Sequence, residues 1–167
     1  SAGTVDCLFD DNTDEYWFLE ANTRLQVEHP VTEEVTGIDL VAEQIKIARG
    51  DELEFAQDDI DWHGHAIEAR LYAEDPGNNF LPEIGTLHAY DTSLASEVRW
   101  DSGVEEGSVI GTDFDPMLSK VISWAPDRID AANKLARGLE KAHMGGVITN
   151  RQFLISCLRN ENFLNGN

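Results

Sequence analysis

A run near the start of the chain places polar residues at every second position from Glu20 to Glu28, and then continues into His29 and Pro30. A period of two is the pattern of a β-strand, because successive side chains of a strand point to opposite faces. The run therefore predicts a strand with one polar face, made up of Glu20, Asn22, Arg24, Gln26 and Glu28. Surface strands usually carry polar residues without a chemical role, but this face combines carboxylates, amides and a guanidinium group.

These side chains have the chemistry of a site for a metal ion and an anion. Two carboxylates and an amide oxygen are hard ligands of the kind that Mg²⁺ prefers, and bound Mg²⁺ often contacts substrate phosphates as well. Arg24 can bind a planar oxyanion through two parallel hydrogen bonds, which a lysine does less well. The run thus predicts Mg²⁺ beside a small oxyanion.

The same run resembles the biotin carboxylase family of biotin-dependent acyl-CoA carboxylases, whose ATP-grasp domain ends in the pattern E-x-N-x-R-x-Q-V-E-H-P. The first part, Glu20 to Arg24, is common to many ATP-grasp ligases, whereas the continuation from Gln26 through Glu33 is specific to this family. The resemblance extends from Ser1 almost to Asn167 and corresponds to the C-terminal half of a biotin carboxylase. It implies an α+β fold, with residues 1–50 forming the end of the ATP-grasp domain and residues 51–167 forming the C-terminal domain of mixed sheet and helices.

Local patterns predict the elements of the first part. Strands at 3–9 and 16–20 flank a polar turn and form a hairpin. A helical pattern follows from Val31 to Arg49, interrupted at Gly37; Asp39 is expected to cap a second helix that ends at Gly50.

In the second part, strict alternation predicts a half-buried strand from His65 to Glu74. Shorter strands are expected at 86–90, 97–101 and 118–124. Pro126 is expected to open a helix that ends near Gly145, and Asn150 to cap a last helix.

The resemblance assigns roles to the polar run. Glu20 would bind Mg²⁺ with Asn22 as a supporting ligand, and Asp6 stands where the family has a second metal-binding glutamate. Arg24, Gln26 and the backbone amide of Val27 would hold bicarbonate, while Glu28 would remove its proton. From the residues alone, Glu28 is equally compatible with a salt bridge.

Two further residues are assigned to biotin by the resemblance. Arg70 would stabilise the biotin enolate, although in isolation an arginine between Glu68 and Tyr72 is better explained as one member of a cross-strand ion pair. Asp115, in the sequence Phe114-Asp115-Pro116-Met117, matches an aspartate that contacts biotin. Arg99 and Trp100 match a region near the dimer contact of the family.

Composition excludes several other functions. The net charge is −20, from 12 basic and 32 acidic residues, which argues against a surface for nucleic acid or for anionic membranes. This acidity is compatible with adaptation to high salt. The five histidines lack metal-ligand spacing, and Cys7 and Cys157 are expected to be buried reduced thiols, as in a cytoplasmic or mitochondrial-matrix protein.

The function implied by the resemblance is ATP- and bicarbonate-dependent carboxylation of biotin through carboxyphosphate, the first half-reaction of an acyl-CoA carboxylase. The cofactors would be ATP, Mg²⁺ or Mn²⁺, and biotin on a carrier domain. The partners would be that carrier domain, a carboxyltransferase subunit, the remainder of the carboxylase chain and a second copy in a homodimer. No glycine-rich phosphate loop is present, so we expect the chain by itself to be inactive.

Two alternatives remain open from the sequence. Another ATP-grasp ligase, of the carboxylate-amine or carbamoyl-phosphate type, would share Glu20, Asn22 and Arg24, but the continuation to Pro30 and the spacing to Arg70 argue against it. A non-catalytic dimerisation module of the same fold would have no need for Glu20, Arg24, Glu28 and Arg70 together. The final acyl-CoA acceptor is not encoded here, because its choice belongs to a carboxyltransferase.

Overall fold

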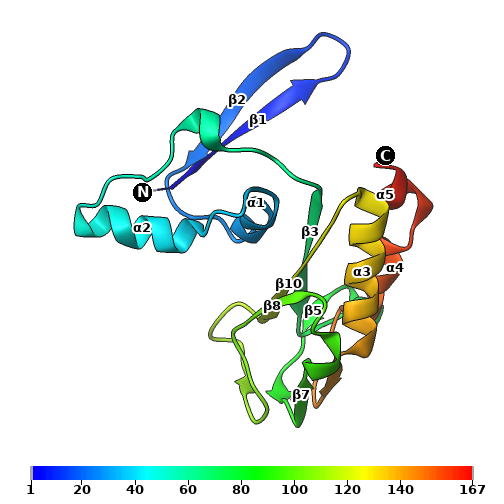
Figure 1. Ribbon diagram of the computed structural model, residues 1–167. Helices are drawn as coiled ribbons and strands as arrows, with labels where there is room; N and C mark the ends of the chain where they lie inside the picture. Colours follow the sequence, from blue (N-terminus) through cyan, green and yellow to red (C-terminus); the bar gives the residue numbers. More distant parts are fainter. Residues whose placement is uncertain (1, 167) are drawn as a thin grey trace. The chain divides into compact units, whose positions relative to one another are not determined.

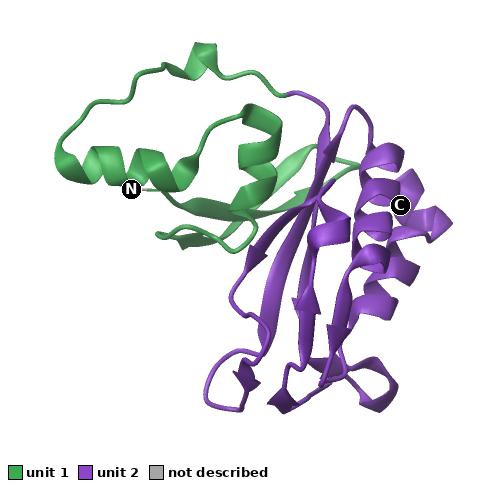
Figure 2. Cartoon of the chain, turned by 60° about the horizontal axis from the view of Figure 1, so that its bottom comes forward, with its two compact units in different colours: residues 1–62 green, residues 63–167 purple. Residues whose placement is uncertain are grey.

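The structure is a computed structural model that describes residues 2–166, and it divides into two compact units (Figure 2). Unit 1 is Ser1–Trp62 and unit 2 is His63–Asn167. Each unit is described by itself. These compact units are defined by contacts within the chain, whereas the domain boundary expected between residues 50 and 51 stays a prediction.

Unit 1 begins with an antiparallel hairpin of β1 (Thr4–Asp10) and β2 (Glu15–Asn22) (Figure 1). The connecting turn is held by the Asp10 carboxylate, which accepts a hydrogen bond from the backbone amide of Asn12 at 2.8 Å. Asp14 has a φ of 56°, the left-handed conformation that aspartate tolerates in turns. The predicted hairpin is confirmed.

The strand predicted beyond Asn22 is wrong, because the chain leaves the sheet at that residue. Residues 23–28 form an irregular loop, and α1 (His29–Thr36) begins directly after it. Pro30 lies in the first turn of α1, where the missing amide hydrogen costs nothing and the fixed φ suits a helix. Arg24, Gln26 and Glu28 are therefore loop residues and do not share a strand face with Glu20.

The two predicted helices after this loop are confirmed. Gly37 ends α1 with a φ of 73°, and Gly50 ends α2 (Leu40–Arg49) with a φ of 95°, both in the left-handed region that favours glycine. Asp39 caps α2 by accepting a hydrogen bond from the Ala42 amide at 2.8 Å. A 3₁₀ turn, η1 (Gln57–Asp59), lies in the acidic segment that follows.

Unit 2 contains a three-stranded antiparallel sheet in the order β3 (His65–Tyr72), β10 (Met117–Ala125) and β8 (Arg99–Ser102). α3 (Arg128–Lys141) packs along this sheet, and Figure 1 shows it beside β10 and close to α4. Ala69 and Leu71 of β3 are buried while Arg70 between them is exposed. The predicted strand and its buried face are confirmed, but β3 ends at Tyr72 instead of Glu74, and Glu68 on the expected polar face is only 5% exposed.

Short elements complete unit 2. The paired strands are β4 (Glu74–Asp75) with β5 (Leu81–Pro82), β6 (Gly85–Thr86) with β9 (Val109–Ile110), and β7 (Ala89–Asp91) with β11 (His143–Gly145). Two 3₁₀ turns, η2 (Pro76–Asn78) and η3 (Ser93–Ala95), and the helices α4 (Arg151–Leu158) and α5 (Glu161–Asn165) make up the rest.

The helix predicted from Pro126 begins slightly later and ends earlier than expected. Asp127 is its N-cap, because its carboxylate accepts a hydrogen bond from the Asp130 amide at 2.8 Å. α3 then ends at Lys141, and the chain enters β11. Within α3, Gly138 is in close contact with Val98: a Cβ atom at this position would lie 2.6 Å from Cγ2 of Val98.

The core of unit 2 is formed by side chains of β3, β10, α3 and α4, including Leu71, Val121, Leu135, Leu139 and Ile155. Both cysteines are free, as predicted, but Cys7 is exposed and Cys157 is only partly buried, so their predicted burial is wrong. Cys7 lies on the hairpin, whose apolar residues remain largely uncovered. Among the described residues, no helix has both the length and the apolar character needed to cross a membrane.

Candidate functional site

The carboxylates of Asp6 and Glu20 lie on one face of the hairpin. The two residues are register partners between β1 and β2, just before a bulge at which Cys7 pairs with Phe18 instead of Leu19. Asn22 lies two residues after Glu20 and so on the same face. Its Nδ2 atom donates to Asp6 Oδ2 at 3.3 Å and to Glu20 Oε1 at 3.1 Å.

This arrangement fits a magnesium ion that shares its coordination with substrate. In the part of the chain that the structure describes, no three His, Cys, Asp or Glu side chains form a complete metal cage. Two carboxylates with one amide instead match the usual protein contribution to a Mg²⁺ site, where phosphates and water supply the remaining oxygens. Rotation of the Asn22 carboxamide would turn its oxygen towards a cation held by the two carboxylates.

A second group of side chains connects the loop at 23–28 to the hairpin. Arg24 Nη1 donates to Gln26 Oε1 at 3.0 Å, and Gln26 Nε2 donates to Thr4 Oγ1 at 3.1 Å. Thr4 is the register partner of Asn22, so this chain of hydrogen bonds ends beside the carboxylate group. The structure therefore brings Arg24 and Gln26 together by a route other than the predicted strand.

Arg24, Gln26 and Glu28 line one cavity of about 470 Å³ within unit 1. Leu25, His29 and Thr32 also contribute to its wall. A cation, an amide and a carboxylate on one cavity could bind a small oxyanion and exchange a proton with it. These are the requirements for binding and deprotonating bicarbonate.

His29 supports this loop, a role that the sequence analysis did not assign to it. Its Nδ1 atom lies 2.7 Å from the carbonyl oxygen of Gln26, and because a carbonyl only accepts, Nδ1 is the donor. Its Nε2 atom lies 4.0 Å from Glu33 Oε1, and the same Glu33 oxygen accepts from the Leu40 amide at 2.9 Å. The one feature of the sequence that could have indicated this role is the position of His29 within the run from Gln26 to Glu33.

Arg70 lies on β3 of unit 2, beside Glu68. The Nε atom of Arg70 is 3.9 Å from Glu68 Oε1, which is longer than a hydrogen bond. The Glu68 side chain is 5% exposed, whereas that of Arg70 is 45% exposed. Arg70 thus contacts Glu68, as predicted, and also shares a hydrogen bond with Tyr72, while almost half of its side chain stays exposed.

The charges of both Arg70 and Asp115 act on Tyr72. Burial raises the pKa of the Tyr72 phenol and the negative charge of Asp115 raises it further, while the charge and hydrogen bond of Arg70 act in the opposite direction. Burial and the charge of Asp115 likewise raise the pKa of Glu74. The turn of Asp115 adjoins the end of β3, because Met117 is the register partner of Tyr72 and the Ala73 amide donates to the Pro116 carbonyl oxygen at 3.0 Å.

Asp115 itself is held by a local turn. Its Oδ1 atom accepts a hydrogen bond from the Met117 amide at 2.9 Å. It lines a cavity of about 390 Å³ together with Phe114, Pro116 and Met117. The charges of Arg70 and Asp115 thus act on the same tyrosine within unit 2. The other site residues predicted from the sequence all belong to unit 1: Asp6, Glu20, Asn22, Arg24, Gln26, Val27 and Glu28.

Asp101 forms a charge cluster with Arg99 and Lys120 on the same sheet. Arg99 donates to both Asp101 oxygens, at 2.8 and 3.0 Å, and Lys120 Nζ lies 3.5 Å from Oδ2. Burial alone would raise the pKa of Asp101, but the hydrogen bonds and charges of Arg99 and Lys120 outweigh burial and lower it. Lys120 is also the register partner of Arg70.

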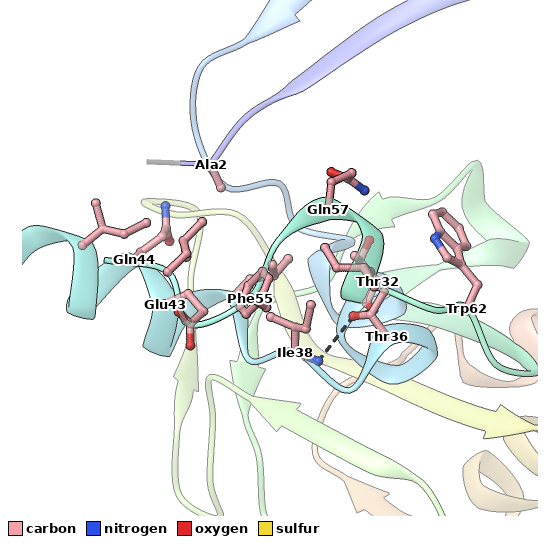
Figure 3. Close-up of a pocket in the computed structure, with 13 residues that line it drawn as sticks. Ala2, Thr32, Thr36, Ile38, Glu43, Gln44, Phe55, Gln57 and Trp62 are labelled. Carbon is pink, nitrogen blue, oxygen red and sulfur yellow. Dashed lines mark hydrogen bonds between the residues drawn. The ribbon is translucent and has the colours of Figure 1, made fainter. Parts of the chain in front are cut away.

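An apolar pocket of about 320 Å³ also lies in unit 1, between α1, α2 and the segment that leads to Trp62 (Figure 3). Ile38, Phe55 and Trp62 contribute to its wall. The backbone amide of Ile38 donates to Thr36 Oγ1 at 3.3 Å at its edge. None of the site residues predicted from the sequence lines this pocket.

Two families match consecutive parts of the chain. The Biotin carboxylase C-terminal domain family matches residues 68–167, and the Carbamoyl-phosphate synthase L chain, ATP binding domain family matches residues 1–56. The first match covers more than half of the chain. The fold is therefore that of an ATP-grasp ligase end followed by a biotin carboxylase C-terminal domain, and the predicted α+β architecture is confirmed.

Individual relatives agree with this class. The chain is 44% identical to the mitochondrial methylcrotonoyl-CoA carboxylase subunit alpha of Glycine max and 46% identical to the mitochondrial propionyl-CoA carboxylase alpha chain of Homo sapiens. These matches cover 100% and 99% of this chain and 23% of each relative. The chain spans about a quarter of the length of these relatives.

Solved structures give the same result. The biotin carboxylase domain of Hydrogenobacter thermophilus 2-oxoglutarate carboxylase, a dimer with MgADP, ADP and bicarbonate, matches with a TM-score of 0.93 and 38% identity, over 99% of this chain and 36% of that one. Complete pyruvate carboxylase from Rhizobium etli matches with a TM-score of 0.91 and 38% identity, over 98% and 17% of the two chains. The chain belongs to the biotin carboxylase family.

Proposed function

We propose that the chain forms the C-terminal part of a biotin carboxylase, which uses ATP and bicarbonate to carboxylate biotin through carboxyphosphate. One observation carries this proposal: Thr4 pairs with Asn22 across the hairpin and accepts a hydrogen bond from Gln26. The oxygens suited to a metal and the groups suited to an oxyanion therefore lie at one end of the same hairpin. Coupling a nucleotide phosphate to bicarbonate requires this proximity.

In this proposal Asp6, Glu20 and Asn22 hold Mg²⁺, which would neutralise charge on the phosphates of bound ATP. Arg24 and Gln26 bind bicarbonate in the cavity that they share with Glu28, and the backbone amide of Val27, in the same loop, is the third group assigned to bicarbonate. Glu28 then accepts the bicarbonate proton, so that an oxygen of bicarbonate can attack the γ-phosphate; the bond between the β- and γ-phosphates breaks, ADP leaves and carboxyphosphate forms. The Mg²⁺ and bicarbonate of the H. thermophilus domain support these ligand classes.

In the second step, Arg70 stabilises the negative charge that develops on the ureido oxygen of the biotin substrate, and Asp115 helps to orient biotin. This assignment is supported by the exposed guanidinium of Arg70 and by its electrostatic link, through Tyr72, to Asp115. A group that stabilises charge present only during the reaction increases the rate more than it increases binding.

We assign the biotin to a separate carrier domain and the acyl-CoA step to a carboxyltransferase, with a homodimer as the assembled state. The names of the two CoA carboxylase relatives and the dimer of the H. thermophilus domain support this assembly. The location, cytoplasmic or in the mitochondrial matrix, stays a prediction, and the choice of acyl-CoA belongs to the carboxyltransferase.

The test uses Glu28→Gln in the complete carboxylase chain, with bicarbonate-dependent ATP cleavage as the readout. Glutamine keeps the size of the side chain but cannot accept the proton, so the rate should fall by about 100-fold or more. Glu52→Gln, at an exposed position of unit 1, serves as the control and should be unaffected. An unchanged rate in Glu28→Gln would exclude the proposed base.

A further inference from the structure

Asn150 is a buried residue that connects α4 to β3. It immediately precedes α4 and is only 6% exposed. Its side chain does not cap the helix, although the sequence predicts that role. Instead, Oδ1 accepts a hydrogen bond from the Tyr72 amide at 2.9 Å, and Nδ2 donates to the Arg70 carbonyl oxygen at 3.2 Å.

The backbone of Asn150 adds a third hydrogen bond, because its amide donates to the Tyr72 carbonyl oxygen at 3.1 Å. β3 is an edge strand of the three-stranded sheet, so the backbone groups of Arg70 and Tyr72 on this side have no neighbouring strand. A carboxamide offers one acceptor and donors, as a peptide group does. Asn150 therefore takes the place of a neighbouring strand at these two residues.

The opposite side of β3 is irregular at the same position. Tyr72 pairs with Met117 and Leu71 pairs with Ser119, so that Leu118 is the extra residue of a bulge in β10. A bulge interrupts the regular ladder and leaves the local direction of a strand less constrained. The bonds from Asn150 supply that constraint from the other side.

The direction of the Arg70 side chain depends on this constraint. Its guanidinium contacts Glu68 at 3.9 Å and shares a hydrogen bond with Tyr72, and both of these partners lie on β3, so this group moves with the backbone of the strand. Tyr72 is held by the same amide side chain.

We propose that Asn150 is a positioning residue for biotin carboxylation, which holds the backbone of β3 so that Arg70 and Tyr72 point towards the biotin substrate. This inference rests on the proposed role of Arg70. Asn150 acts only through these residues and does not touch a reacting atom. It should therefore affect the biotin step and leave the earlier chemistry of unit 1 intact.

The test compares two reactions of Asn150→Ala in the complete carboxylase chain. Carboxylation of free biotin should have a kcat at least tenfold lower, because the guanidinium is no longer directed. Bicarbonate-dependent ATP cleavage measured without biotin should stay within twofold of the parent value. A merely structural role would lower both rates in parallel, and that outcome would overturn the inference.

Asn160→Ala is the matched control. Asn160 is an exposed asparagine that caps α5 by accepting a hydrogen bond from the Asn162 amide at 2.9 Å. Its removal should change neither rate. If Asn150→Ala does not fold, Asn150→Ser replaces it, because serine can cap α4 through its hydroxyl group and keeps the backbone bond to Tyr72. The same selective loss is expected for Asn150→Ser, and equal losses in both reactions would overturn the inference.

The Arg70→Ala variant separates this inference from the proposed function. Normal carboxylation by Arg70→Ala would remove the proposed role of Arg70 itself, whatever Asn150 does. Slow carboxylation by Arg70→Ala together with normal carboxylation by Asn150→Ala would overturn the positioning role alone. In the double variant, Asn150→Ala should slow Arg70→Ala by less than twofold further, since a positioned group that is absent cannot be misplaced.

Discussion

Asp6 and Glu20 face each other across the β1–β2 hairpin, and both accept a hydrogen bond from the same nitrogen of Asn22. The two distances, 3.3 and 3.1 Å, are similar despite the shorter side chain of Asp6. The register of the hairpin therefore places the two carboxylates side by side, as the proposed metal site requires. This geometry supports Asp6 as a ligand of the proposed site, although the family has a glutamate at this position.

Substitution of these carboxylates in the complete chain should raise the Mg²⁺ concentration needed for ATP cleavage. We expect an increase of about tenfold for Asp6→Asn and a larger one for Glu20→Gln, because loss of a carboxylate weakens binding of a hard cation. Asp6→Glu should retain parent behaviour, since it restores the residue type of the family. Titration of ATP cleavage with Mg²⁺ measures all three, with Asp11→Asn in the exposed turn as the control. A Glu20→Gln variant with an unchanged Mg²⁺ requirement would exclude the metal site.

Arg70→Ala should slow biotin carboxylation by about 100-fold, the scale seen when a donor to a developing oxyanion is removed. The KM for biotin should change much less, because the charge is absent from the ground state. If Arg70 serves only in its ion pair with Glu68, Arg70→Ala should lower stability and leave the carboxylation rate of the folded variant unchanged, because it removes a positive charge beside a carboxylate that is only 5% exposed. Arg159→Ala, which removes an exposed arginine that pairs with Glu140 at 2.7 Å, is the matched control.

Asp101 should contribute stability that depends on pH in the acid range. Its pKa in the folded protein lies below the ordinary value of 3.8, so its stabilising effect is complete above about pH 4 and is lost as the pH falls through the lower, folded value. Urea unfolding of the parent and of Asp101→Asn should therefore differ most at pH 5–7 and converge towards the acid limit. Exposed Asp113→Asn is the control. A difference that grows on acidification would contradict the assigned direction of the shift.

Gly138→Ala should destabilise unit 2, although alanine is the better helix former by about 1 kcal/mol. The new Cβ would lie 2.6 Å from Cγ2 and 3.0 Å from Cγ1 of Val98, a short and rigid side chain that cannot turn away. Overpacking of this kind costs about 1–3 kcal/mol, which exceeds the gain in helix propensity. Thermal unfolding should show the loss, and in a Val98→Ala background Gly138→Ala should become neutral or stabilising.

Local patterns were sufficient to predict the hairpin, the caps of α2 and the buried face of β3, because each depends on neighbours in sequence. The continuation of β2 to Glu28 failed for a physical reason: alternating polar residues suit a solvated loop as well as a strand. Only tertiary bonds, such as that from Gln26 to Thr4, decide between the two, and these join residues that are 22 positions apart. The sequence pattern therefore grouped Arg24, Gln26 and Glu28, which do line one cavity, but it placed them on a strand where the structure has a loop.

Asn150 illustrates the same limit for the site. An asparagine before a helix is an expected N-cap, and nothing nearby in the sequence indicates that its amide instead binds a strand 78 and 80 residues earlier. The electrostatic link between Arg70, Tyr72 and Asp115 likewise depends on how β3 and the turn before β10 meet. The residue types were sufficient to indicate which side chains are candidates for the site. The contacts that hold these side chains in place could be seen only in the folded structure.

The distribution of buried side chains has a consequence for hydrogen exchange. Among the described residues of unit 1 only Pro30, Glu33 and Val35 are buried, whereas β3, β10 and α3 of unit 2 enclose a continuous core. Amides of the hairpin and of the loop at 23–28 should therefore exchange through low-energy local openings, while those of β3 should require nearly global unfolding. The groups suited to Mg²⁺ and bicarbonate thus belong to the most easily opened part of the chain, and ligand binding there should appear as slower exchange before it changes the melting of the core.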